Sequence, residues 1–164
     1  MGKAAIAGLL SLLAMTGCRV PITEQAKEPA LRPSAVFEGL PLSGNLATAL
    51  AAGFGDCLAD TIVLRCTKRQ VRVMGVGPVL AAVDIGLKSR RFDHVTLWHR
   101  TDQSLLLELR PLLGTSGWRS CLTADEERFW RPPNPIRIAI DTNYWANRRA
   151  VLSAPPPVRQ PYCP

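Results

Sequence analysis

The chain has 164 residues, a formal net charge of +7 and a hydrophobic content of 47%. These values are typical of one globular domain and exclude a disordered or fibrous protein. Only two histidines are present, His94 and His99, which limits the residues available for histidine-based catalysis and metal binding.

The amino terminus has the pattern of a secretion signal. Lys3 precedes an apolar run over residues 4–15, which is shorter than the roughly 20 residues that a spanning helix needs. The run ends in Met15-Thr16-Gly17-Cys18. This motif resembles the lipobox of bacterial lipoproteins, with Met15 where that family usually has Leu. The alternatives are an ordinary secretory signal and an uncleaved anchor.

The resemblance implies cleavage before Cys18 and attachment of lipid to the sulfur of Cys18. The mature protein would then be held at a membrane of the bacterial cell envelope and face the periplasm. Arg19 follows the cysteine instead of the Asp that retains many lipoproteins at the inner membrane, which favours the outer membrane.

Composition divides the chain into four segments: a signal peptide over residues 1–17, a lipidated tether over 18–34, an α+β domain over 35–153 and a proline-rich tail over 154–164. The tether contains Pro21, Pro29 and Pro33 and has no apolar period, so we expect no fold of its own. The tail favours an extended polyproline conformation, and Cys163 near its end would attach it to the domain.

Within the domain, a short strand is expected near residues 36–40, followed by a helix from an N-cap at Ser43 to Gly53. Strands are expected over residues 61–66, 70–76 and 79–85, with Gly77-Pro78 as the turn between the last two. Residues 94–99 and 104–109 then form a hairpin, because Leu105, Leu107 and Leu109 alternate.

One helix over residues 103–113 is the alternative to this second hairpin strand, but Pro111 would lie in its interior. Pro111 instead suits the first turn of a short helix that ends at Gly117. Further strands are expected over 136–140 and 148–152. The predicted fold is α+β: a mostly antiparallel sheet of six to eight strands with two short helices on one face.

A short motif suggests a duplicated αβ unit. Gly53-Phe54-Gly55-Asp56-Cys57 and Gly117-Trp118-Arg119-Ser120-Cys121 share Gly-aromatic-x-x-Cys at an offset of 64 positions, and residues 71–74 match 136–139 at an offset of 65. A glycine at this place suits a helix C′ position, where the backbone needs a positive φ. A chance match is the alternative.

Four cysteines remain after Cys18 is removed, and in an oxidising compartment they predict two disulfides. Cys57 and Cys66 are close in sequence and are predicted to pair. Cys121 has no equivalent local partner, so it is predicted to pair with Cys163. The spacings do not suit zinc, and no metal or cofactor is expected.

Candidate site residues are few. Arg65, Lys68, Arg69 and Arg72 form a candidate patch for an anionic partner, with a solvated face as the alternative. The histidines His94 and His99 are more readily explained by a strand edge or by packing than by catalysis. Asp56 and Asp60 suit loop capping, and the acidic run Asp125-Glu126-Glu127 suits a solvated loop tip. Trp130 and Trp145 could form a binding platform or close the end of the sheet.

The sequence therefore predicts a non-catalytic cell-envelope lipoprotein that binds or supports another envelope component. Its partners are a membrane, through lipid on Cys18, and an envelope protein or anionic polymer; no nucleic acid is expected. The alternative is a periplasmic inhibitor or immunity-type lipoprotein that acts on a hydrolase, and an enzyme, a hydrolase, comes third.

Overall fold

A computed structural model describes residue 22 and residues 26–99, 104–142 and 149–155. The predicted signal peptide, Cys18, Trp145, Cys163 and most of the proline-rich tail lie outside these residues. The fold below is therefore the fold of the predicted domain and of the last part of the predicted tether.

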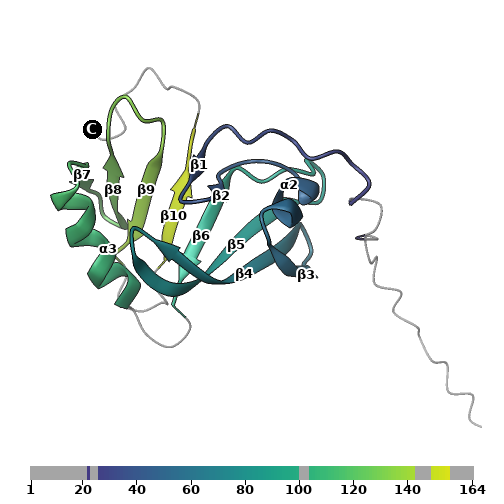
Figure 1. Cartoon of the computed structure of the whole chain (residues 1–164), viewed down its shortest axis with the longest axis horizontal. Coiled ribbons are helices and arrows are strands. Elements are labelled where there is room, and N and C mark those ends of the chain that lie inside the picture. The colour runs from purple at the N-terminus through teal and green to yellow at the C-terminus, as the bar shows by residue number, and fades with distance from the viewer. Residues whose placement is uncertain (1–21, 23–25, 100–103, 143–148, 156–164) are drawn as a thin grey trace, which may run out of the picture.

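Eight strands form one antiparallel sheet in the order β3-β4-β5-β6-β10-β9-β8-β7 (Figure 1). They are β3 (Gly55–Ala59), β4 (Val63–Val73), β5 (Val76–Gly86), β6 (His94–Trp98), β7 (Arg119–Leu122), β8 (Glu126–Trp130), β9 (Arg137–Asp141) and β10 (Ala150–Ser153). The helices are α2 (Leu46–Ala51) and α3 (Ser104–Thr115), and β1 (Val36–Phe37) pairs with β2 (Leu40–Pro41) in a separate hairpin. The predicted antiparallel α+β fold is confirmed.

One face of the sheet carries the core. Strand alternation places Cys66, Val95, Leu152, Ile138 and Phe129 on this face, and all five are buried. Both helices bury leucines in the same core: Leu46 from α2, and Leu105, Leu109 and Leu113 from α3. We call the opposite face, where Thr96, Val151, Ala139, Arg128 and Cys121 lie across neighbouring strands, the open face.

The two halves of the domain share one topology. Each consists of a helix followed by four strands, and the last strands of the halves, β6 and β10, pair at the centre of the sheet. The glycines of the short motif occupy equivalent places: Gly53 follows α2 with a φ of 83°, and Gly117 follows α3 with a φ of 77°. The aromatic residues after them, Phe54 and Trp118, are both buried. The topology thus supports the duplicated unit.

Beyond Phe54 and Trp118, the position-by-position match predicted between the two halves is wrong. The register of β3 shifts between Gly55 and Leu58, and β7 has no such shift. Counting from the turn, Ala59 pairs with Leu64 and Leu122 pairs with Glu127, so the position of Cys66 corresponds to the buried Phe129. The two matched strand segments are not equivalent either, because residues 71–74 end the second strand of one half and 136–139 lie at the third strand of the other.

The segment over residues 104–109 is helical, and the predicted hairpin strand is wrong. Leu105, Leu109 and Leu113 recur every four residues along α3 and are fully buried, whereas Leu107 is 69% exposed. Pro111 lies inside the helix on its exposed side. Its missing N–H would have bonded to the carbonyl of Leu107, which water can reach, so burial of the three leucines outweighs the lost hydrogen bond.

Two predicted boundaries also differ. The N-cap of α2 is Asn45, whose side chain accepts a 3.0 Å hydrogen bond from the amide of Thr48. The turn between β4 and β5 is Met74-Gly75, where φ is 53° and 83°, and Gly77-Pro78 lies inside β5. Two consecutive residues with positive φ give a tight hairpin connection that follows the twist of the strands.

The cysteines agree in part with the prediction. Cys57 and Cys66 form a disulfide, which is confirmed. Cys121 is disulfide-bonded as well. Its predicted partner, Cys163, lies outside the described residues.

Candidate functional site

The open face of the sheet brings together polar groups from distant parts of the chain. Three ion pairs lie across it: Arg65 with Asp84 at 2.6 Å, Arg128 with Glu126 at 2.6 Å, and Arg149 with Asp141 at 3.2 Å. Small side chains, Ala139 and Thr96, lie between them on the central strands. The face is thus charged toward its sides, and Thr96 and Val151 lie on its two central strands.

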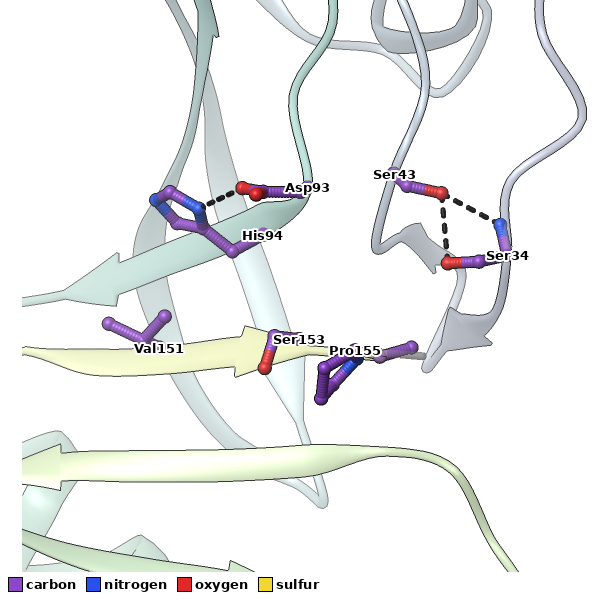
Figure 2. A pocket seen from close by; sticks show the side chains of 8 residues that line it. Ser34, Ser43, Asp93, His94, Val151, Ser153 and Pro155 are labelled. Carbon is purple, nitrogen blue, oxygen red and sulfur yellow. Dashed lines mark hydrogen bonds and ion pairs between the residues drawn. The ribbon is translucent and has the colours of Figure 1, made fainter. Parts of the chain in front are cut away.

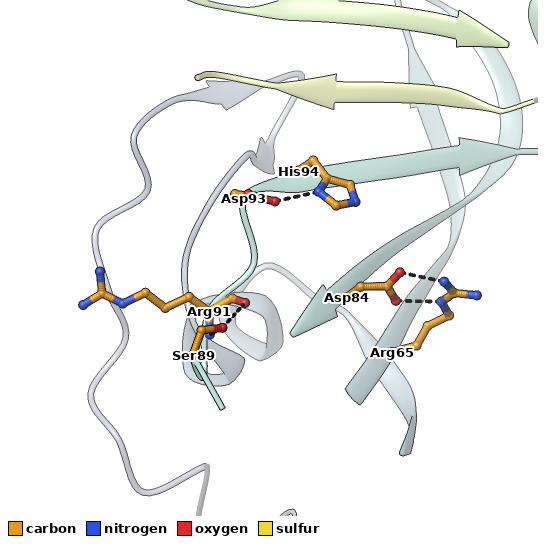
Figure 3. A network of polar contacts seen from close by, with 6 residues as sticks. All are labelled: Arg65, Asp84, Ser89, Arg91, Asp93 and His94. Carbon is orange, nitrogen blue, oxygen red and sulfur yellow. Dashed lines mark hydrogen bonds and ion pairs between the residues drawn. The ribbon is translucent and has the colours of Figure 1, made fainter. Parts of the chain in front are cut away.

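Arg65 and Asp84 form the best-defined of these pairs. Nε and Nη2 of Arg65 donate to the two oxygens of the Asp84 carboxylate at 2.7 and 2.6 Å (Figure 3). These hydrogen bonds raise the pKa of Arg65 above its ordinary value, so the guanidinium stays charged and held by its partner.

The predicted anionic-partner patch does not form one surface. Arg65 lies on the open face with Asp84, whereas Lys68 lies on the core face, where Nζ donates to the carbonyl of Ala52 after α2 at 2.8 Å. Arg69 pairs with Asp56 at 3.2 Å, and Arg72 donates to the carbonyl of Gly75. Each cation already has a partner, so we do not assign ligand binding to this patch.

A cavity of about 390 Å³ lies at one end of the central strands (Figure 2). Its lining comes from three parts of the chain: the start of β6, the end of β10 with the residues after it, and the segments beside the small hairpin. The lining residues are Asp93 and His94, then Val151, Ser153, Ala154 and Pro155, and Ser34 with Ser43. The hydroxyl of Ser43 donates to that of Ser34 at 2.9 Å and accepts from the amide of Ser34 at 2.7 Å.

The cavity brings together the residue types of a hydrolytic triad, and their geometry does not suit that chemistry. Nδ1 of His94 lies 2.7 Å from the Asp93 carboxylate, and Ser153 is directly across from His94 on β10. Asp93 is 91% exposed, so water screens its charge. Figure 2 shows the second ring nitrogen of His94 pointing away from Ser153. Nothing in this arrangement activates the hydroxyl of Ser153.

The other candidates have structural roles. Asp60 accepts a 2.6 Å hydrogen bond from the amide of Thr61 and caps the turn before β4. His99 lines a small cavity with Leu105 and Glu108 of α3. The acidic run is not a solvated loop, because Glu127 is buried on the core face and contacts Arg110 of α3 at 2.5 Å. Sequence reasoning missed this pair, since the alternation of Glu127 with Phe129 was its only signal.

Of the two tryptophans predicted to form a platform, Trp130 lies on β8 across from Arg137, and Trp145 is outside the described residues. Trp118 is a core residue with its ring edge against Phe37 and the guanidinium of Arg131 over its face. A platform built from both predicted rings is therefore not described.

No group of three metal-ligating side chains occurs among the described residues. Within the same part of the chain, no helix is long and apolar enough to cross a membrane. Comparison of the chain with protein families, curated proteins and solved structures finds no match.

Proposed function

We propose that the protein is a non-catalytic bacterial cell-envelope lipoprotein that binds another envelope component through the open face of its sheet. The anchoring half of this proposal rests on the apolar run that ends in Met15-Thr16-Gly17-Cys18. The binding half rests on one observation: the open face collects paired charges and small side chains from five strands and from Arg149 just before β10, and neither described helix packs on it. Such a surface suits recognition of a partner.

The tether supports the anchored arrangement. Its last residues are held against the domain, because Nδ2 of Asn45 donates to the carbonyl of Pro29 at 2.7 Å and Thr48 donates to the carbonyl of Leu31 at 2.8 Å. Ten residues then lie between Cys18 and Pro29, and a flexible chain of that length has a typical reach of about 16–19 Å. Lipid on Cys18 would thus hold the domain close to the membrane.

The second predicted disulfide, Cys121–Cys163, belongs to the same proposal. Since Cys57 and Cys66 bond each other, the bonded sulfur of Cys121 is left with Cys18 or Cys163 within this chain, and lipid would occupy Cys18. Cys121 pairs with Arg128 and therefore lies on the open face.

The tail can reach Cys121. Strand β10 ends at Ser153, which lies opposite Arg137 on β9. Arg137 in turn lies opposite Trp130 on β8. Crossing from β10 to β7 covers about 15 Å, and the eight residues from Pro155 to Cys163 span about 25 Å in a polyproline conformation. The tail would then cover one end of the open face.

Two measurements test the proposal. Intact mass of the protein from the membrane fraction should show an acylated cysteine at Cys18, and Cys18→Ala should remove both the acyl mass and the membrane attachment that persists at high salt. Photocrosslinkers placed at Val151 or Ala139 on the open face should capture an envelope component, whereas one at Leu107 on α3 should not. A mature start other than Cys18 contradicts the anchor, and equal capture at Leu107 contradicts the binding face.

The alternative is a periplasmic inhibitor or immunity-type lipoprotein. In that case the captured component would be a hydrolase, and the purified domain would lower its activity. A hydrolase activity of the chain itself is the third candidate, favoured only by the meeting of Asp93, His94 and Ser153 in one cavity.

A further inference from the structure

We propose that the end of the domain formed by residues 86–91 and the β3–β4 turn docks on a bilayer surface that contains anionic phospholipid headgroups. We call these residues, with Ile62 in the turn and Lys88, Arg90 and Arg91 in the loop, the docking end. The inference rests on the proposed function, since the lipid on Cys18 would bring the docking end to the membrane.

The cations of the docking end differ from those of the predicted patch, because they have no acidic partner in the part of the chain that the structure describes. Lys88, Arg90 and Arg91 are all exposed, and within the described residues none of the three forms an ion pair with a carboxylate. Their charge is therefore available to an external anion.

The loop that presents these cations is held in shape by its own backbone. The amide of Arg90 donates to the carbonyl of Gly86 at 2.7 Å, and the amide of Gly86 donates to the carbonyl of Arg91 at 3.0 Å. Figure 3 shows Ser89 and Arg91 together in this loop, where the hydroxyl of Ser89 donates to the carbonyl of Arg91 at 3.3 Å. A closed loop fixes the backbone that carries the three side chains before they meet a surface, which reduces the backbone entropy lost on binding.

An exposed apolar side chain adjoins the cations. The amide of Leu87 donates to the carbonyl of Ile62 at 2.9 Å, which places the loop beside the β3–β4 turn. Ile62 is 73% exposed, and Leu58 on the same hairpin is 76% exposed. Basic residues around exposed apolar side chains are the composition that binds at the headgroup boundary of a bilayer.

The docking end is also where the tether meets the domain. Phe92, the residue after Arg91, exchanges both backbone hydrogen bonds with Gly44, at 3.1 and 3.0 Å. Gly44 precedes Asn45, which holds Pro29 of the tether. The chain from Cys18 therefore joins the domain next to the three cations, and the purple segment in Figure 1 lies beside α2.

Three acidic residues lie near this end and reduce its net charge. Asp60 is exposed in the β3–β4 turn, Asp93 pairs with His94, and Glu28 lies in the tether. Lys27 and Arg32 in the tether, both exposed, offset two of them. The local excess of positive charge thus comes from Lys88, Arg90 and Arg91.

The test uses the mature chain from residue 18 with Cys18→Ala, so that no acyl group contributes. Vesicles of phosphatidylcholine with and without 30% phosphatidylglycerol are sedimented with the protein at low and at physiological salt. We expect binding only to the anionic vesicles, and a loss of binding as salt rises. Each cation near an anionic surface contributes enough that Lys88→Gln/Arg90→Gln/Arg91→Gln should lower the partition coefficient on the order of 100-fold.

The matched control is Arg119→Gln/Arg131→Gln/Arg149→Gln, which removes the same charge outside the docking end and should keep most of the binding. Ile62→Asn should weaken binding at constant charge. Equal binding to both kinds of vesicle, or equal loss in the control triple, would overturn the proposal.

A second measurement does not depend on the unacylated chain. Protein extracted from membranes is placed in nanodiscs of either lipid composition, and amide hydrogen exchange is followed over residues 60–63 and 86–91. Slower exchange in the anionic discs is expected, and unchanged exchange would contradict the docking end. Failure of the proposed lipoprotein assignment shows separately, as a missing acyl mass on Cys18.

Discussion

Nε of Arg110 on α3 lies 2.5 Å from a carboxylate oxygen of Glu127 on β8, and Glu127 is buried on the core face of the sheet. The side chain of Arg110 is 63% exposed, so the pair joins an exposed helix residue to a carboxylate in the core. A buried carboxylate is costly unless a partner compensates it.

We therefore expect Arg110→Ala to lower the free energy of unfolding by about 2 kcal/mol, because it leaves the Glu127 carboxylate without its cation. Urea denaturation followed by circular dichroism measures the change. Arg119→Ala, an exposed arginine on β7, should stay within about 0.5 kcal/mol of the wild type. The double variant Arg110→Met/Glu127→Leu should recover most of the loss, and a double variant less stable than Arg110→Ala would contradict this account.

Pro111→Ala should stabilise the protein. The alanine restores the N–H that can bond to the carbonyl of Leu107 and removes the clash inside α3. Greater freedom of the unfolded chain offsets part of this gain, which leaves about 1–2 kcal/mol. The melting temperature measures the change, and Pro135→Ala in the loop before β9 is the control without a helix. A decrease in stability would contradict this account, because it would mean that Pro111 stabilises α3 in the folded protein.

Loss of the Cys57–Cys66 disulfide should cost about 2.5–3 kcal/mol, the constraint expected for a loop of this length. The variant Cys57→Ala/Cys66→Ala is compared with the wild type by urea denaturation under oxidising conditions. Both proteins are then measured in dithiothreitol, where the wild type should fall toward the variant. If the variant and the oxidised wild type unfold at the same urea concentration, this bond contributes nothing to stability.

Ser153 should not react with a fluorophosphonate probe. The carboxylate that orients His94 is almost fully in water, and the free ring nitrogen does not face the hydroxyl (Figure 2). Mass spectrometry of the probe-treated native protein checks this, with heat-unfolded protein as background. Labelling at Ser153 that His94→Ala removes would establish the hydrolase instead.

Peptide mapping without reduction should find a peptide that links Cys121 to Cys163, in addition to the one that links Cys57 to Cys66. The open-face position of Cys121 and the length of the tail allow this bond. In the Cys163→Ser variant, the thiol of Cys121 should be free and should react with a maleimide. A peptide that links Cys121 to Cys18 would contradict both this pairing and lipid on Cys18.

Much of the fold was readable from the sequence because it depends on neighbours in the chain. Gly53 and Gly117 end helices at a positive φ, Cys57 bonds the nearby Cys66, and strand alternation marked the sheet. The antiparallel α+β class followed from these local signals.

Tertiary packing decided the rest. Leu105, Leu107 and Leu109 share one strand face, whereas only Leu105 and Leu109 share a helix face. Burial of Leu113 with Leu105 and Leu109 selects the helix in spite of Pro111. The residues of the predicted basic patch do not share one surface, and the reason is again their contacts with other elements. Arg65 and Lys68 lie on opposite faces of β4, and their partners, Asp84 and the carbonyl of Ala52, come from other elements. A local pattern records which residues could share a surface, but contacts between distant segments determine which of them do.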